Sequence, residues 1–455
     1  MSSGEKKISP IAWVPTAYFA MGLPFVVLNM ASVLMFQGLG VDDVQIAFWT
    51  SLILLPWTLK PLWSPFLELF RTRKFYVVVT QFITGVAFGL VALSLTFNHF
   101  FPVAIAFLAL VAFSGATHDI ACDGVYMGAL TPAQQSKYIG WQGAFYNIAK
   151  LAATGGLVYL SGYFISRFSA EGTFIANRNA WMIIMGILSV TMLLLALYHI
   201  FILPKGGEAA VSVGSGRRTA ADVTRELWMV LKEFFTKKHI WYYIAFILLY
   251  RFGEGFVVKI VPLFLKAGRD VGGLGLDNQQ IGVYYGTFGA AAFVLGSLLA
   301  GYYISGRGLR RTLFSLCCIF NIPFAVYAFL AFFQPESGWL IASGIVFEYF
   351  GYGFGFVGLT LFMMQQVAPG KHQMAHYAFA SGIMNLGVMI PGMLSGWLSN
   401  AMGYSVFFIF VLVATIPAFI VTWFVPFRYD DKGQLLDAAE ADAVMAPDTD
   451  EIIKQ

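Results

Sequence analysis

The chain is a series of long apolar runs separated by short charged or Pro- and Gly-containing breaks. A helix needs about 20 mainly apolar residues to cross a bilayer, and each run is long enough to do so. The strands of a membrane β-barrel would be about ten residues long and would alternate in polarity, which excludes a barrel. The pattern therefore predicts an all-α membrane protein with twelve transmembrane helices, numbered here as spans one to twelve, at residues 10–37, 44–68, 75–97, 102–130, 136–166, 180–203, 241–267, 279–304, 312–333, 338–367, 372–400 and 404–427.

One connection between the spans is long and polar. It covers residues 204–240 and contains seven lysine and arginine residues. It divides the chain into an N-terminal six-helix half at 1–203 and a C-terminal six-helix half at 241–428. Residues 429–455 carry eight carboxylates, and such runs of like charge are usually disordered. We therefore expect a basic cytoplasmic linker and a disordered acidic cytoplasmic tail.

The composition agrees with a membrane protein and excludes other classes. Hydrophobic residues make up 58% and charged residues 11% of the 455 residues, whereas soluble domains contain about 25% charged residues. The net charge of +4 is too small and too scattered to indicate nucleic-acid binding. The first run is longer than the core of a cleaved signal peptide, so we interpret it as a retained helix. Three cysteines are too few for a disulfide framework or a four-ligand zinc site.

The basic residues predict how the chain is oriented in the membrane. If both termini lie inside, twenty lysine and arginine residues fall on the inner side, and four, Arg167, Arg178, Lys266 and Arg269, fall outside. Cytoplasmic loops of membrane proteins are enriched in Lys and Arg. We therefore expect a multi-pass protein whose N- and C-termini are cytoplasmic.

The two halves contain corresponding features. A basic turn follows the second helix of each half, and Pro132 precedes Asn147 by about as many residues as Pro369 precedes Asn385. Two related six-helix halves with a polar linker resemble the major facilitator architecture, in which a solute binds near the membrane midplane between halves that rock against each other. The sequence therefore predicts a secondary transporter.

Three segments of the first half stand out: Gly22-Leu23-Pro24, residues 56–65 (PWTLKPLWSP) and residues 116–123 (ATHDIACD). They resemble the signature segments of the AmpG-like permeases, in the peptide/acetyl-CoA transporter branch of the major facilitators. The resemblance implies a proton-driven importer in the bacterial inner membrane, and the family's name-giving member carries anhydromuropeptides. Glu68 and His118 stand where the family usually has Asp and Gln, so a sugar or oligosaccharide is a further expected solute class.

Eight ionisable side chains fall within the predicted spans. An unpaired charge in the hydrocarbon region costs at least about 3 kcal/mol, so we expect these groups to pair with one another or to face water. Four are cationic and four are anionic, and each half has two of each sign. They are Lys60, Asp119, Asp123 and Lys150 in the first half, and Arg251, Glu254, Lys259 and Glu348 in the second.

Asp119 and Asp123 are the predicted proton-coupling residues. Their spacing of four residues places both carboxylates on one face of span four, where mutual repulsion favours protonation of one of them. Lys60 and Lys150 are the predicted alternating counter-ions. The alternative is a permanent ion-pair cluster that braces spans two, four and five. The resemblance adds that both aspartates occupy the acidic motif of the AmpG-like permeases, which favours the coupling hypothesis.

Span seven carries the predicted solute-binding charges. Arg251 and Glu254 share a helix face, and Lys259 lies two turns further along. A cation in a water-filled cavity could bind an anionic group of the solute, while the alternative is that Arg251 and Glu254 only neutralise each other. The remaining solute-binding candidates are side chains that are polar or aromatic within apolar runs, and packing or interhelical hydrogen bonds are the alternative for each: Glu348, Tyr352, Asn29, Gln142, Asn147 and Asn385.

Several other functions are not expected. The histidines have no metal-ligand spacing, and neither a nucleotide fingerprint nor a nucleophile elbow is present. We therefore expect no enzyme activity, no metal and no cofactor, with the proton gradient as driving force. The expected partners are a small solute, either a saccharide or a muropeptide, and the lipid bilayer, and the protein is expected to be a monomer. Export of drugs or metabolites is the alternative function, because the sequence predicts orientation but not the direction of flux.

Overall fold

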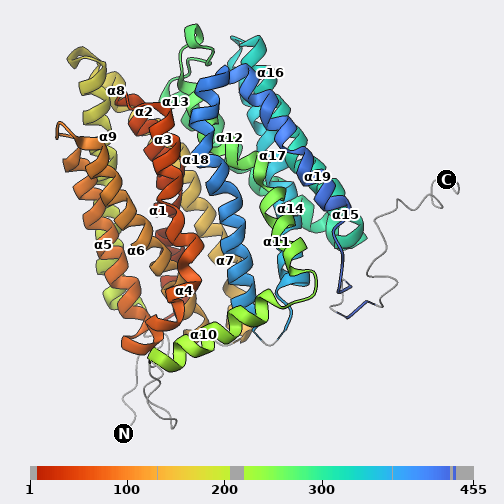
Figure 1. Ribbon diagram of the computed structural model, residues 1–455. Coiled ribbons are helices and arrows are strands. Elements are labelled where there is room, and N and C mark those ends of the chain that lie inside the picture. The colour runs from red at the N-terminus through yellow and green to blue at the C-terminus, as the bar shows by residue number, and fades with distance from the viewer. Residues whose placement is uncertain (1–7, 131, 205–219, 371, 431–433, 437–455) are drawn as a thin grey trace, which may run out of the picture. The chain divides into compact units, whose positions relative to one another are not determined.

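The computed structural model describes residues 8–130, 132–204, 220–370, 372–430 and 434–436, which form helices joined by short connections (Figure 1). The predicted all-α fold is confirmed. Packing divides the chain into two compact units: unit 1 extends to Leu227 and includes Gly275–Thr287, and unit 2 comprises Trp228–Leu274 and the chain from Phe288 onward. The predicted boundaries of the two halves and of the linker stay a prediction. Most of the predicted tail lies outside the described residues.

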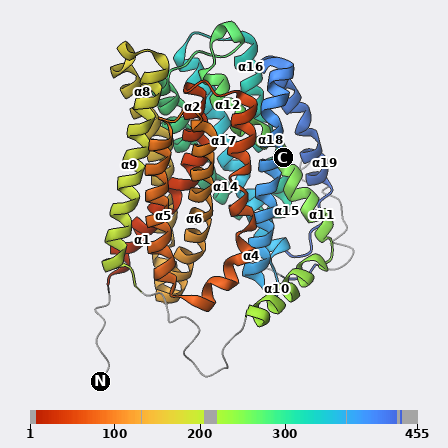
Figure 2. The ribbon, with the colours of Figure 1, turned by 60° about the vertical axis from the view of Figure 1, so that its left-hand side comes forward.

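Unit 1 contains the helices of spans one to six. Helices α5, α6 and α9 pack side by side (Figure 2), and α1 packs against α7. The elements are α1 (Pro10–Val26), η1 (Val27–Ala31), α2 (Ser32–Gly38), α3 (Asp43–Leu52), α4 (Leu55–Phe70), α5 (Arg73–Ser94), α6 (Phe100–Ala129), α7 (Pro132–Leu151), η2 (Ala152–Leu157), α8 (Val158–Arg167), η3 (Ser169–Glu171) and α9 (Thr173–Ile202).

The beginning of span eight also packs in unit 1. It consists of α13 (Asn278–Ile281), with a capping box between Asp277 and Gln280, and η6 (Gly282–Phe288), whose last residue belongs to unit 2. Asn278 Nδ2 donates to Ser161 Oγ of α8 at 2.9 Å. Spans five and eight are therefore held together here by a buried hydrogen bond.

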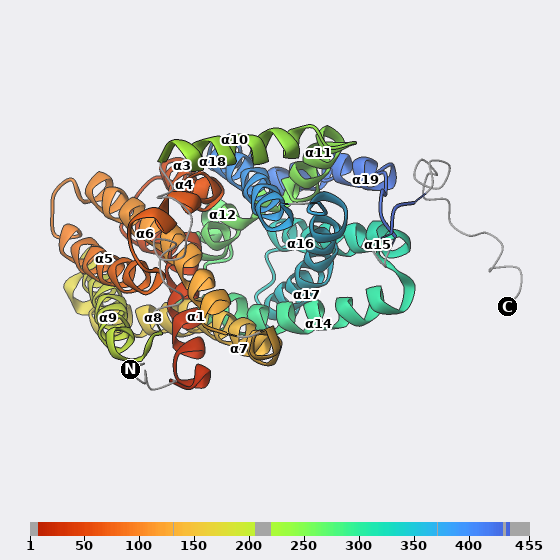
Figure 3. The same cartoon turned by 90° about the horizontal axis from the view of Figure 1, so that it is seen from below.

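Unit 2 contains the remaining spans. Helix α14 packs along α17, and α12 packs along α18 (Figure 3). The elements are α10 (Ala220–Phe235), whose first residues belong to unit 1, α11 (Ile240–Tyr250), α12 (Phe252–Lys266), η5 (Arg269–Val271), α14 (Gly289–Arg307), α15 (Leu309–Asn321), η7 (Ile322–Phe324), α16 (Ala325–Phe333), α17 (Gly338–Phe362), η8 (Met363–Val367), α18 (Gln373–Ala414) and α19 (Ile416–Trp423).

Within the described ranges, nine helices are long and apolar enough to cross a membrane. The twelve predicted spans are consistent with this number for two structural reasons. Spans two and seven are interrupted, between α3 and α4 and at Arg251, so that none of their helices reaches the 18 residues required. Spans eleven and twelve count as one helix, although the chain bends between them at Gly403, whose φ of 71° is a backbone conformation that glycine adopts without strain.

Glycines of α17 allow close packing in unit 2. A Cβ atom at Gly353 would meet the backbone of Phe293 in α14, and one at Gly351 would meet the carbonyl oxygen of Ile319 in α15. Small residues let membrane helices approach closely. The glycines that the sequence shows in span ten therefore serve helix packing.

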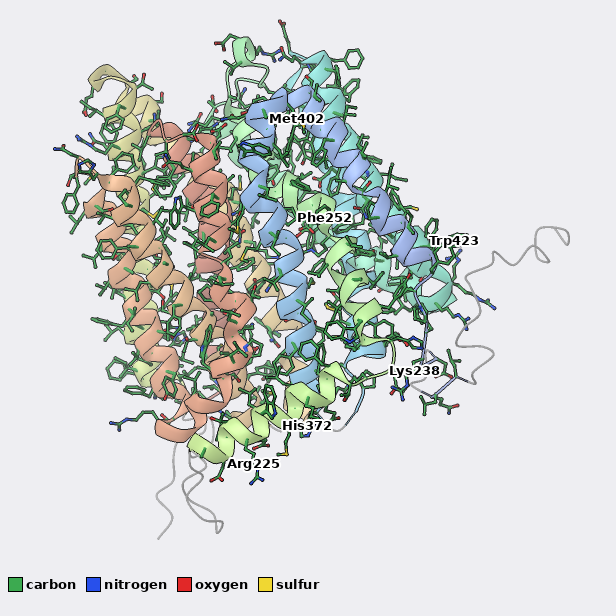
Figure 4. The ribbon with its side chains drawn as sticks, in the orientation of Figure 1. Arg225, Lys238, Phe252, His372, Met402 and Trp423 are labelled. Carbon is green, nitrogen blue, oxygen red and sulfur yellow. The ribbon has the colours of Figure 1, made fainter. Side chains whose placement is uncertain are left out.

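A helix lies in the region that the sequence analysis treated only as a polar linker. Helix α10 buries Val230 and Phe234, and Lys237, just after it, donates to the carbonyl oxygens of Val367 at 2.7 Å, Ala368 at 3.3 Å and Pro369 at 2.7 Å. Figure 4 labels Arg225 on α10 and Lys238 just after Lys237. A lysine at the carbonyl end of a helix satisfies oxygens that have no partner within the helix. Lys237 thus fastens the end of α10 to the end of η8.

Candidate transport site

The acidic residue Asp119 lies in the middle of α6 and contacts two side chains of α4. Its Oδ2 accepts a hydrogen bond from Trp57 Nε1 at 2.8 Å and lies 3.7 Å from Lys60 Nζ. Only 9% of Asp119 is exposed, and its Oδ1 is buried with no hydrogen-bond partner among the described residues. The structure therefore joins two of the four predicted coupling residues, Asp119 and Lys60, in an ion pair.

Asp123 has a different partner, from α1. The Tyr18 hydroxyl donates to Asp123 Oδ1 at 2.8 Å, and the Tyr18 ring meets the edge of Tyr126 at a centroid distance of 5.8 Å. Tyr18 is buried in the same apolar cluster as Tyr126. The two predicted carboxylates thus differ in their surroundings: Asp119 has a cation beside it, whereas Asp123 is bound by a neutral hydroxyl group.

Lys150, the second predicted counter-ion, lies in the last turn of α7. Its Nζ lies 5.1 Å from the centroid of the Tyr146 ring, within the range of a cation–π interaction. In this conformation Lys60 forms the ion pair with Asp119, and Lys150 lies over an aromatic ring.

Beside Asp119 begins a chain of buried hydrogen bonds that sequence reasoning missed. His118 Nε2 lies 2.9 Å from Gln81 Nε2, Gln81 Oε1 lies 2.9 Å from His199 Nδ1, and His199 Nε2 lies 2.9 Å from Thr16 Oγ1. These hydrogen bonds join α6, the helix that carries Asp119, to α5, then α5 to α9 and α9 to α1. Single polar residues inside apolar runs were the signal, but their pairing depends on tertiary contacts.

Unit 2 contains a second group of buried charges at the interruption of span seven. Arg251 donates from Nε and Nη2 to the two carboxylate oxygens of Glu254, and both residues are more than nine-tenths buried. The Arg251 Cζ lies 5.1 Å from the centroid of the Phe356 ring. The predicted continuous helix is wrong here, because Arg251 leaves helical geometry between α11 and α12. The structure therefore contains the ion pair between Arg251 and Glu254, which was one of the two alternatives for these residues.

Glu348, Tyr352 and Lys259 lie in the same unit. The Tyr327 hydroxyl of α16 donates to Glu348 Oε2 at 2.8 Å. Tyr352 packs against the Phe293 ring at 4.9 Å between centroids and interacts electrostatically with both groups of the Arg251–Glu254 pair. Lys259 is 1% exposed.

The predicted amide candidates are not joined into one group by their described contacts. Asn29 Nδ2 donates to the carbonyl oxygen of Phe25, and Asn147 Nδ2 to that of Gly143, each at 2.9 Å and each within its own helix. The alternative to solute binding was a hydrogen bond between helices, whereas both of these bonds lie within a single helix. Gln142 Oε1 is buried without a hydrogen-bond partner in the described chain. Asn385 is half-buried in α18.

A metal site is not found in the part of the chain that the structure describes: no three His, Cys, Asp or Glu side chains lie close enough together to hold an ion. The buried ionisable groups of the described chain can pair with charges, exchange protons or bind polar groups of a solute. They are distributed over both units.

Comparison with known proteins agrees with a transport site. The family model described as "Major Facilitator Superfamily" matches residues 16–373. The "Anhydromuropeptide permease" of Escherichia coli K12 is 22% identical over 410 residues, which cover 89% of this chain and 77% of that protein. The "Putative transporter AmpG 2" of Rickettsia felis is 22% identical and covers 92% of this chain and 96% of its own. The predicted resemblance to the AmpG-like permeases is therefore confirmed.

Among solved structures, a D-xylose-proton symporter has the same fold. Its TM-score is 0.68 at 13% sequence identity, and the alignment covers 94% of this chain and 99% of the symporter. At this identity the similarity concerns the fold alone.

Proposed function

The chain belongs to the Major Facilitator Superfamily, and from this membership we propose that it is a proton-coupled importer of a muropeptide, an oligosaccharide or a related sugar-containing solute. The family consists of membrane transporters, so a multi-pass transporter of a small solute is the expected class. The resemblance to an anhydromuropeptide permease supports the solute class. The proposed location is the bacterial inner membrane.

The observation that carries the proposal is the ion pair between the buried Asp119 and the partly exposed Lys60. A carboxylate inside a membrane protein is stabilised by a counter-ion, and here Lys60 and the Trp57 N–H both act on Oδ2. A proton that bonds to Oδ1, the oxygen without a partner, cancels the charge of Asp119 and leaves Lys60 without its counter-ion. Proton binding therefore changes the contact between α4 and α6, which is what coupling to a conformational change requires.

Uptake into proteoliposomes tests this proposal. We expect an inwardly directed proton gradient, with the outside more acidic than the inside, to drive accumulation of a labelled anhydromuropeptide, a disaccharide or an amino sugar. A gradient of one pH unit is worth about 1.4 kcal/mol per coupled proton, so accumulation should reach about tenfold per proton. Liposomes with equal pH on both sides are the control. Uptake that does not depend on pH would contradict proton coupling and leave the fold assignment intact.

The proposed orientation places both termini in the cytoplasm. Cysteines introduced at Asn98 and Ser337, which are exposed, should react with an impermeant maleimide from outside the cell. A cysteine at Arg225 on α10, also exposed, should react only after the membrane is opened. Replacement of Cys122, Cys317 and Cys318 by serine provides the background. The reverse labelling pattern would overturn the orientation derived from the basic residues.

A further inference from the structure

Glu348 is a buried carboxyl group that the proposed reaction at Asp119 does not use. It lies in α17, 5% of it is exposed, and its Oε2 accepts a hydrogen bond from Tyr327 at 2.8 Å. Tyr327, in α16, is fully buried. The carboxyl group is therefore held away from water by two packed helices.

The groups around Glu348 do not neutralise it. Glu254 of α12 interacts with it as a like charge, and Tyr352, one turn along α17, contributes a neutral hydroxyl group. Arg251 is engaged by both carboxylate oxygens of Glu254. No ion pair of the described residues involves Glu348. An anionic Glu348 would thus be buried beside another anion without a counter-ion.

We infer that Glu348 is a neutral carboxylic acid in this conformation and carries a second proton through the transport cycle. This inference rests on the proposed proton coupling. A buried carboxylate without a counter-ion costs several kcal/mol, whereas the neutral acid keeps the hydrogen bond from Tyr327 through its carbonyl oxygen, Oε2. The proton is bonded to Oε1, comes from water when a conformational change exposes the group, and returns to water on the other side.

Release of the proton from Glu348 would affect the nearby Arg251–Glu254 pair. When Glu348 releases its proton, it becomes an anion that repels the carboxylate of Glu254, the partner of Arg251. Arg251 lies at the interruption between α11 and α12, where the backbone is not held in a continuous helix. Release of the proton from α17 would therefore act on the point at which span seven can bend.

Infrared spectroscopy of the purified protein in lipid tests the protonation of Glu348 without any solute. Protonated carboxyl groups and carboxylates absorb at separate frequencies. We expect the Glu348→Gln variant to lose a protonated-carboxyl band at neutral pH. The matched control is Glu336→Gln, which removes an exposed carboxylate and should lose only carboxylate absorption. Loss of carboxylate absorption in Glu348→Gln would overturn the inference.

Transport with a labelled anhydromuropeptide, and a pH-sensitive dye inside the liposomes, tests the second proton. Glu348→Gln keeps a neutral group that can accept from Tyr327, so we expect it to fold, and its effect on coupling is measured as the number of protons moved per solute. Under a gradient of one pH unit, its steady-state accumulation should fall about tenfold, the value of one proton. Glu336→Gln should accumulate like the wild type.

The two proposals fail in different ways. If the wild type moves the muropeptide without protons, the proposed coupling is wrong. If the wild type moves protons and Glu348→Gln moves the same number per solute, coupling stands and the role of Glu348 is refuted.

Discussion

Asp119→Asn should remove the part of gradient-driven accumulation that one proton supplies, while solute exchange at equal pH continues. The amide oxygen can still accept the hydrogen bond from Trp57, so the packing of α4 on α6 should persist. The amide cannot bind the coupling proton, and it cannot pair with Lys60. The Lys60 side chain is 26% exposed and can reach water once the pair is lost. Under a gradient of one pH unit, the accumulation ratio should fall about tenfold, the value of the one proton that Asp119 carries.

Asp123→Asn is the comparison that separates the two carboxylates. Asp123 is bound by the Tyr18 hydroxyl, which can also donate to an amide oxygen, so this variant should fold as well. If both aspartates take part in coupling, both variants lose accumulation. Normal accumulation in both variants would show that the carboxylates are structural, which was the alternative for the acidic motif.

Arg251→Gln should destabilise the protein by about 3–5 kcal/mol, because it leaves the carboxylate of Glu254 buried without its partner. Glu254→Gln should be similarly costly, because it leaves a buried guanidinium. The double variant removes both charges and should recover most of the lost stability. Thermal unfolding and the yield of purified protein, measured for both single variants and for the double variant, provide the test.

Solute binding in the same variants decides whether these charges also contact the solute. If Arg251 binds an anionic group, the double variant should fold but bind the anionic solute about 1.5–3 kcal/mol more weakly, the usual contribution of a hydrogen bond to a charged group. A neutral analogue should be affected far less. Recovery of both stability and transport in the double variant would remove span seven from the solute site.

The sequence predicts the helices well because apolar runs of sufficient length have few alternatives in a bilayer. It does not predict the interruptions, although Pro56 and Gly253 each lie two residues after one of them, because proline and glycine also occur inside continuous membrane helices. Helix α10 was missed for another reason. Its buried residues, Val223, Val230 and Phe234, recur at helical spacing, but the basic residues around them indicated a polar linker. The side chains that cover Phe234, those of His376 and Phe379, belong to a distant part of the chain.

The candidate site was predictable as a set of residues but not as a set of contacts. Intramembrane charge identified Asp119 and Lys60, yet the choice of Lys60 over Lys150 as the ion-pair partner depends on how α4 packs on α6. Trp57 and Tyr18 were missed because aromatic residues in apolar runs usually signal packing. Their polar atoms become informative only when a carboxylate is found beside them.

The attachment of Lys237 to the carbonyl groups at the end of η8 and just after it makes the second part of α10, from Trp228 onward, part of the body formed by unit 2. A spin label or fluorophore on the exposed Lys232 of this helix is therefore a reporter of the C-terminal helices rather than of an independent linker. The label sits on a surface outside the predicted spans, so it can follow their movement without disturbing the buried charges.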